Sequence, residues 1–190
     1  MNVGLFFGSF NPIHTGHLII ASYIVEYSPI DCLWFVVSPH NPMKKKKSLA
    51  NDYDRFEMVT LAIGNDPRFE ACDIEFHLPK PSYTIHTLTY LKEKYPQNHF
   101  SLIMGADNYE HLNKWKNYEV LLSDYSFIVY PRPGHSCDND ALPATVIRVD
   151  APLMEISSTF IRNALAENRD IRHFVPEAVY QYIQKHHLYH

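Results

Sequence analysis

The sequence predicts an α/β fold: a doubly wound parallel sheet with a small C-terminal helical portion. Apolar runs of strand length alternate with segments of helical periodicity, and the last two helical segments close the chain. Parallel neighbouring strands need a crossover connection, which the intervening helices provide. Because 190 residues can bury a sizeable core and no linker or repeat divides them, we expect a single domain over residues 1–190.

The expected strands are short, apolar and rich in β-branched or aromatic residues. In chain order they are Val3–Phe7, Cys32–Val37, Phe69–Ile74, Phe100–Met104, Phe127–Tyr130 and Thr145–Val149. Gly8 ends the first strand and Gly105 ends the fourth. In an open sheet of this kind, ligands are expected beyond the carboxyl ends of the strands.

The expected helices follow from their apolar faces and their end signals. They are His14–Tyr27, a helix after Asp52, a helix from Ser82 to about Tyr95, Ser157–Glu167 and Pro176–His187. Asp52 and Ser82 are expected to be N-caps, and Pro96 stops the third helix. Pro176 is expected at the first position of the last helix.

Composition excludes several classes of protein. A formal net charge of −4 argues against broad nucleic-acid binding, although local cations and amides can still bind a small anion. Cys32, Cys72 and Cys137 lie far apart without a CxxC pair, which indicates reduced thiols rather than disulfides or zinc. The apolar runs are too short for a signal core or a membrane span, so we expect no membrane association and a cytoplasmic location.

The most informative segment is GSFNPIHTGH, Gly8–His17, directly after the first expected strand. Gly8 allows a sharp turn, and Gly16 allows a ligand to approach the backbone closely. A helix that begins near Thr15 directs unpaired amides at that ligand, which favours phosphate oxygens. The segment therefore predicts a phosphate site.

His14 and His17 lie three residues apart, so at a helix start they can share a side and donate to one phosphate group. Such donors stabilise the charge that grows during phosphoryl transfer. Two histidines alone are also compatible with ordinary polar residues at a helix start. The other common phosphate motifs, GxxxxGK[ST] and GxGxxG, are absent from the sequence.

A second candidate anion site is ISSTFIR, Ile156–Arg162. Ser157 or Ser158 is a suitable N-cap, and hydroxyls with amides at a helix start can bind an anion. Arg162 follows one turn later, where its guanidinium can bridge two phosphate oxygens. A capped helix with a solvated arginine is the alternative interpretation.

Together the two segments resemble the (H/T)xGH and ISSTxIR signatures of the nucleotidyltransferase superfamily, which adenylylates or cytidylylates small acceptors on a Rossmann-like fold. The resemblance implies phosphate contacts by His14, His17, Lys44 and Arg162, and Mg²⁺ that arrives with ATP rather than on a protein metal site. It also implies an ATP site that includes Gly8, Ser9, Phe10, Gly16, Gly105, Asp107, Ile156, Ser157, Ser158 and Thr159.

Over nearly the whole chain the resemblance narrows to bacterial nicotinate mononucleotide adenylyltransferases. The matching segments are Pro81–Leu88 (SYTxDTL), Ile103–Asp107 with Lys114-Trp115 (GAD…KW), Pro131–Gly134 (RPG) and Val175–Ile183 (the terminal helix). The resemblance implies ATP and nicotinate mononucleotide as partners, with the acceptor bound by Tyr83, Thr84, Asn108, Tyr109, Trp115 and Arg132. An indole face suits a pyridine ring, although Trp115 is also compatible with a core role.

Two departures from the family pattern stand out. His86 replaces an aspartate of the SYTxDTL segment, and Met43 replaces the histidine of a PPHK-like loop in which Lys44 aligns with the family lysine. Phosphopantetheine adenylyltransferase and a non-catalytic nucleotide-binding module are the alternative functions. The preference for nicotinate over nicotinamide mononucleotide rests on the resemblance alone, and the sequence leaves a homo-oligomer open.

Overall fold

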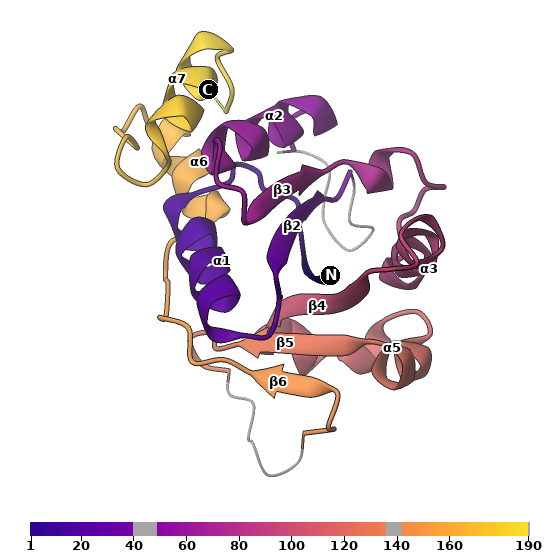
Figure 1. Cartoon of the computed structure of the whole chain (residues 1–190). Coiled ribbons are helices and arrows are strands. Elements are labelled where there is room, and N and C mark those ends of the chain that lie inside the picture. The colour runs from indigo at the N-terminus through magenta and orange to yellow at the C-terminus, as the bar shows by residue number, and fades with distance from the viewer. Residues whose placement is uncertain (40–48, 136–141, 190) are drawn as a thin grey trace.

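The sheet is parallel throughout, as predicted. The computed structural model describes residues 1–39, 49–135 and 142–189 (Figure 1). Its six strands have the order β3-β2-β1-β4-β5-β6. They are β1 (Asn2–Gly8), β2 (Cys32–Val37), β3 (Phe69–Cys72), β4 (His99–Gly105), β5 (Ser126–Tyr130) and β6 (Val146–Arg148). The predicted third strand was two residues too long, because Ile74 belongs to the 3₁₀ turn η2 (Ile74–Phe76).

β1 is the strand at which the winding direction reverses. It pairs with β2 on one side, with Val3 opposite Cys32, and with β4 on the other, with Leu5 opposite Leu102. Crossovers that leave in opposite directions from adjacent strands open a crevice at the carboxyl ends of those strands. The topology therefore places a ligand site at the ends of β1 and β4.

Helices cover both faces of the sheet. They are α1 (Thr15–Tyr27), α2 (Asp52–Ile63), α3 (Thr84–Lys94), α4 (Ala106–Tyr109), α5 (Tyr118–Asp124), α6 (Ser158–Ala166) and α7 (Glu177–Lys185), with a further 3₁₀ turn η3 (Leu112–Lys114). α1, α2, α6 and α7 lie on one face, and α3 and α5 lie on the other (Figure 1). α6 and α7 are the predicted C-terminal helical portion.

Alternation along the strands builds one apolar core on each face. Leu33 and Phe35 of β2 point toward α1 and α2, whereas Trp34 and Val36 point toward α3. β2 is buried along its whole length, which explains why it reads as an unbroken apolar run.

Several predicted helix ends were wrong. Asn51, not Asp52, caps α2 by accepting a hydrogen bond from the Tyr53 amide. Tyr83 occupies the N-cap position of α3, so Ser82 lies one residue outside that helix. Pro176 is the N-cap residue of α7 rather than its first helical residue.

Two cysteines that the structure describes, Cys32 and Cys72, are free, as expected, while Cys137 lies outside the described residues. Within the described ranges, no helix is both long and apolar enough to cross a membrane. The same ranges contain no cluster of His, Cys, Asp or Glu that could hold a metal ion.

Candidate active site

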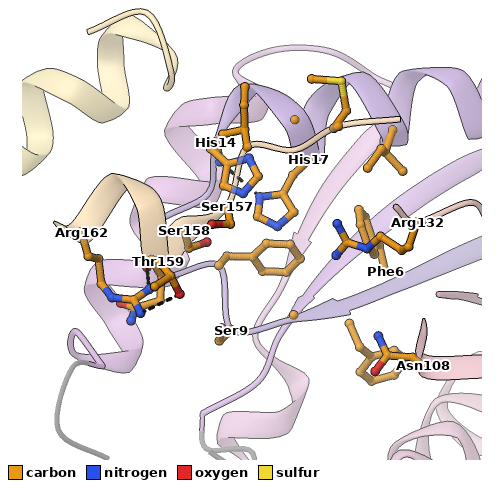
Figure 2. Close-up of a pocket in the computed structure, with 18 of the residues that line it drawn as sticks. Phe6, Ser9, His14, His17, Asn108, Arg132, Ser157, Ser158, Thr159 and Arg162 are labelled. Atoms are coloured by element: carbon orange, nitrogen blue, oxygen red, sulfur yellow. Dashed lines mark hydrogen bonds between the residues drawn. The ribbon is translucent and has the colours of Figure 1, made fainter. Parts of the chain in front are cut away.

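A cavity of about 350 Å³ opens where the chain leaves β1, β4 and β5, and the start of α6 closes its far side (Figure 2). It contains most of the residues that the two phosphate signatures singled out. The predicted site residues that line it are Gly8, Ser9, Phe10, His14, Gly16, His17, Asn108, Arg132, Ile156, Ser157, Ser158, Thr159 and Arg162. None of the described lining residues is acidic, so the cavity suits an anion.

The two histidines act as one unit at the start of α1. Their rings stack with centroids 3.7 Å apart, and the His14 backbone N–H donates to Nδ1 of His17 over 3.3 Å. Because Nδ1 of His17 accepts, the neutral ring carries its proton on Nε2. Both rings face the cavity, as Figure 2 shows. His14 is the N-cap residue of α1, one position before the helix begins.

His14 is held neutral. The residue is only 5% exposed, and burial, with a smaller contribution from the charge of Arg132, lowers its pKa to about 4. Its Nδ1 is buried and has no hydrogen-bond partner among the described residues. A buried ring nitrogen without a protein partner costs free energy, so it is suited to a ligand group.

Phe10 explains the glycine at the end of β1. The Phe10 backbone has φ 42°. The Phe10 ring packs edge-on against the rings of His17 and Phe6, with centroid distances of 5.2 Å and 5.9 Å. A Cβ atom on Gly8 would lie 2.7 Å from the Phe10 ring. Gly8 thus allows the Phe10 ring to fold back against His17 and support it.

Gly16 leaves room for the ring of His14. A Cβ atom there would lie 3.1 Å from Nδ1 of His14. The sequence predicted that a ligand approaches the backbone at Gly16; in the described structure the group that lies close to this glycine is the His14 ring.

The start of α6 supplies hydroxyls, amides and a cation. Ser157 caps the helix by accepting from the Phe160 amide at 3.2 Å, and the Ser158 hydroxyl donates to the Pro12 carbonyl at 2.9 Å. Arg162 donates to the Asn11 carbonyl at 2.8 Å and to the Thr159 hydroxyl at 3.2 Å. These bonds join the two signature segments, which are about 150 residues apart in the sequence.

A second cation approaches from β5. Arg132 lines the cavity, and its Nε lies 3.6 Å from Oδ1 of Asp107, which is an ion pair without a hydrogen bond. Gly105 makes room for this pair, because a Cβ atom there would lie 2.9 Å from Cγ of Arg132. Asp107 does not line the cavity; it lies in the first turn of α4, whose N-cap residue is Gly105.

Several predicted residues lie elsewhere. Lys44 and Met43 fall outside the described residues. Gly105, Asp107, Tyr83, Thr84, Tyr109 and Trp115 do not line this cavity. Tyr83 and Thr84 lie at the start of α3, where the Nζ of Lys116 is 4.5 Å from the Tyr83 ring centroid. Trp115 is half-buried and packs against the α3–α5 core.

The sequence did not single out seven of the lining residues. They are Phe6, Phe7, Asn11, Ile20, Leu49, Tyr130 and Met154. Asn11 is a polar residue within the first signature and could have been found there. Tyr130 and Met154 reach the cavity only through the fold and carry no local signal.

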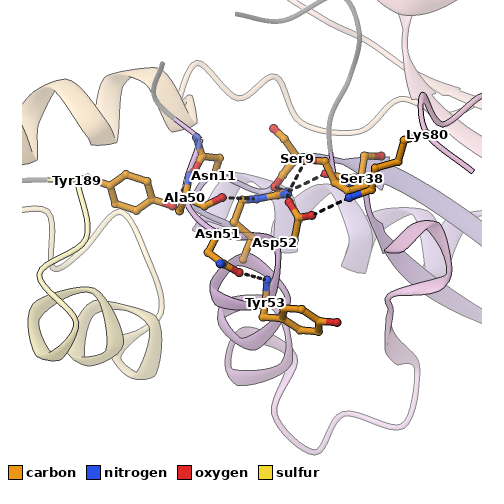
Figure 3. A network of polar contacts seen from close by, with 11 residues as sticks. Ser9, Asn11, Ser38, Ala50, Asn51, Asp52, Tyr53, Lys80 and Tyr189 are labelled. Atoms are coloured by element: carbon orange, nitrogen blue, oxygen red, sulfur yellow. Dashed lines mark hydrogen bonds and ion pairs between the residues drawn. The ribbon is translucent and has the colours of Figure 1, made fainter. Parts of the chain in front are cut away.

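A buried arginine organises the outer edge of the cavity. Arg55 of α2 is 0% exposed and donates to the carbonyls of Ser9 and Ser38. It also donates to the carbonyls of Pro39 and Ala50 and pairs with Asp52 at 2.6 Å (Figure 3). The end of β1, the end of β2 and the start of α2 are thereby tied to one guanidinium.

The comparisons with known proteins agree with this geometry. A family model described as cytidylyltransferase-like matches residues 5–164. A relative from Cytophaga hutchinsonii, named "Probable nicotinate-nucleotide adenylyltransferase", is 53% identical over 183 residues, which cover 96% of this chain and 95% of the relative. A relative of the same name from Bacteroides fragilis is 52% identical over 180 residues, which cover 95% of this chain and 90% of the relative.

Solved structures give the same result. The Plasmodium falciparum nicotinic acid mononucleotide adenylyltransferase complexed with NaAD has a TM-score of 0.84 and is 25% identical, with 99% of this chain and 97% of that chain covered. The Plasmodium falciparum protein complexed with APC has a TM-score of 0.83. The chain belongs to the cytidylyltransferase-like family and, within it, to the nicotinate-nucleotide adenylyltransferases.

Proposed function

We propose that this protein transfers the adenylyl group of ATP to nicotinate mononucleotide, giving nicotinate adenine dinucleotide and pyrophosphate, in NAD biosynthesis. The observation that carries the proposal is the convergence of His14, His17 and Arg162 on one cavity without a described acidic lining residue. The names of the relatives, and the NaAD complex of the Plasmodium falciparum enzyme, support the choice of acceptor.

The chemistry is an in-line displacement at phosphorus. An oxygen of the acceptor's 5′-phosphate forms a bond to the α-phosphorus of ATP, and the bond from that phosphorus to the bridging oxygen of the β-phosphate breaks. A phosphate monoester has a second pKa of about 6, so the nucleophile is already a dianion near neutral pH and needs no general base. Catalysis then rests on positioning and on stabilisation of charge.

The two histidines and the start of α6 contact different phosphates of the triphosphate. His14 contacts the α-phosphate as a neutral donor, consistent with its lowered pKa. His17, protonated on Nε2, donates to the β- or γ-phosphate. Ser157, Thr159 and Arg162 hold the departing pyrophosphate, and their amides and cation suit its growing charge.

The remaining residues of the site serve the nucleoside and the acceptor. Lys44 neutralises phosphate charge. Backbone and side-chain groups of eight further residues contact the phosphates and the adenylate of ATP: Gly8, Ser9, Phe10, Gly16, Gly105, Asp107, Ile156 and Ser158. The acceptor is bound by Tyr83, Thr84, Asn108, Tyr109, Trp115 and Arg132.

Mg²⁺ arrives with ATP. The described residues that line the cavity include no carboxylate, so a dedicated protein cage for the ion would lack its usual ligands. Phosphate oxygens and water supply those ligands instead, and the ion adds positive charge to the triphosphate.

The test is the initial rate of pyrophosphate release with ATP and one acceptor at a time. The panel contains nicotinate mononucleotide, nicotinamide mononucleotide and phosphopantetheine. We expect the highest kcat/KM with nicotinate mononucleotide. If pyrophosphate is released only with phosphopantetheine, that compound is the acceptor and nicotinate mononucleotide is not. If the protein binds ATP but turns over no acceptor, it is a nucleotide-binding module without this activity.

The matched variant is His17→Ala. Loss of one electrostatic contact to the reacting phosphates should lower kcat by about 10²–10³-fold, by analogy with oxyanion donors. Circular dichroism establishes that the variant is folded. A folded His17→Ala protein with full turnover would remove His17 from the mechanism.

A further inference from the structure

The side-chain amide of Asn11 links three segments that are distant in the sequence. Asn11 is 4% exposed and lines the cavity. Its Oδ1 accepts a hydrogen bond from the Ala50 backbone N–H at 3.1 Å and one from the Tyr189 hydroxyl at 2.8 Å (Figure 3). Because a backbone N–H only donates, the amide atom that faces it must be the oxygen, which makes the Tyr189 hydroxyl a donor as well.

The backbone of Asn11 meets the proposed pyrophosphate site. Its carbonyl accepts from Nη1 of Arg162 at 2.8 Å, and Nη2 of the same guanidinium donates to Thr159 at 3.2 Å. Any movement of Asn11 therefore displaces one of the two groups that hold Arg162 in the cavity. Tyr189 does not line the cavity, so it can act on a ligand only through its neighbours.

The chain after α7 reverses sharply to bring Tyr189 to Asn11. The Leu188 amide donates to the Ile183 carbonyl at 3.1 Å and the His187 amide donates to the Gln184 carbonyl at 3.3 Å, a Schellman arrangement. His187 adopts φ 49° and Tyr189 adopts φ 69°, conformations that favour glycine. Non-glycine residues keep such conformations only where surrounding contacts over-determine them.

Those contacts are visible on both sides of the reversal. Leu188 and Tyr189 pack against the apolar core formed by α1, α2, α6 and α7. Burial raises the pKa of the Tyr189 hydroxyl, against the opposing effect of Arg55 and Arg162, so the hydroxyl keeps its proton near neutral pH. Tyr189 is thus a fixed, protonated donor held against the loop that carries the first signature.

We infer that Tyr189 is a positioning residue for nucleotide binding: its hydroxyl fixes Asn11, and Asn11 in turn fixes the guanidinium of Arg162 in the cavity. The inference rests on the proposed function, because it concerns the affinity of the same site for ATP. It assigns a role in the site to a residue 178 positions from Asn11 in the chain.

The decisive comparison is Tyr189→Phe against Tyr182→Phe. Tyr182 also belongs to the C-terminal portion, and its hydroxyl donates to Asp54 of α2 at 2.9 Å. Neither Tyr182 nor Asp54 lines the cavity. Each variant removes one tyrosine hydroxyl and one hydrogen bond. A purely structural role would lower the melting temperature of both variants alike and change ATP affinity in neither.

For Tyr189→Phe we expect about a five-fold higher Kd and KM for ATP, the scale of one net hydrogen bond, with an unchanged KM for nicotinate mononucleotide. Tyr182→Phe should retain the ATP affinity of the wild type. Binding is measured by calorimetric titration with Mg²⁺–ATP in the absence of acceptor. Equal ATP affinity of Tyr189→Phe and the wild type would overturn the inference.

A double-mutant cycle tests the route through Asn11. In an Asn11→Ala background, Tyr189→Phe should cause no further loss of ATP affinity, whereas additive losses would rule out coupling through the amide. The binding measurement also separates the two proposals. If the wild type binds ATP but transfers no adenylyl group, the proposed function fails while the comparison of affinities still decides the role of Tyr189.

Discussion

Arg55→Met removes the guanidinium that ties together the outer edge of the cavity. The side chain is fully buried, and methionine retains an apolar stem while supplying no donor. The substitution removes the hydrogen bonds that the guanidinium donates to four backbone carbonyls and one carboxylate, namely those of Ser9, Ser38, Pro39, Ala50 and Asp52. The Asp52 carboxylate keeps its ion pair with Lys80 at 3.5 Å. The free energy of unfolding should therefore fall substantially.

The size of the loss follows from burial. Breaking a buried charge pair costs about 3–5 kcal/mol, and each buried acceptor left unsatisfied costs about 1–3 kcal/mol. The Asp52 side chain is 27% exposed, so water can replace part of its lost bond. We expect a net loss of about 3–5 kcal/mol, a large fraction of the stability of an ordinary domain.

Urea unfolding at pH 7 measures the effect, with an unchanged m value as evidence that both states keep their compactness. Arg68→Met is the matched control, because Arg68 pairs with Glu26 and Asp66 but its side chain is 40% exposed and its pairs are screened by solvent. Arg55→Lys should be intermediate, since lysine keeps the charge but not the planar fork. A loss for Arg55→Met no larger than that for Arg68→Met would refute the reasoning.

Three further predictions concern the cavity. The pKa of His14 lies near 4 in the folded protein against 6.5 for an ordinary histidine, so protonation favours unfolding, and stability falls as the pH drops from about 6.5 toward 4. Between pH 7 and pH 5 the wild type should lose about 2 kcal/mol more than His14→Gln in urea unfolding, and equal losses would contradict the burial of a neutral ring. Arg162→Lys should lower kcat/KM for ATP by about 10–100-fold in initial-rate assays, because lysine cannot keep Asn11 and Thr159 and also bridge two phosphate oxygens; an unchanged value would argue against the proposed pyrophosphate contact. Excess EDTA should abolish pyrophosphate release, added Mg²⁺ should restore it, and the melting temperature without ATP should stay constant, whereas a drop would indicate a structural metal.

Local sequence determined the fold class and most of the elements. The boundaries of Cys32–Val37 were correct because a strand buried on both faces reads as one apolar run with clear ends. Ser157 was correctly named as a candidate N-cap of α6, since a helix cap depends on residues only three positions apart. The caps at Asp52 and Ser82 were each wrong by one residue, because sequence signals locate a helix end only to within one or two positions; Asn51 and Tyr83 occupy the N-cap positions.

By itself the sequence also determined which residues could meet a triphosphate, since each phosphate signature lies within about ten consecutive residues. Only the tertiary structure decided that the two signatures share one cavity, that burial keeps His14 neutral, and that Arg55 and Tyr189 hydrogen-bond to the loop that carries the first signature. Hydrogen bonds and desolvation depend on distances between atoms. For residues far apart in the chain, those distances are set by the packing of helices on the sheet, which leaves no local trace in the sequence.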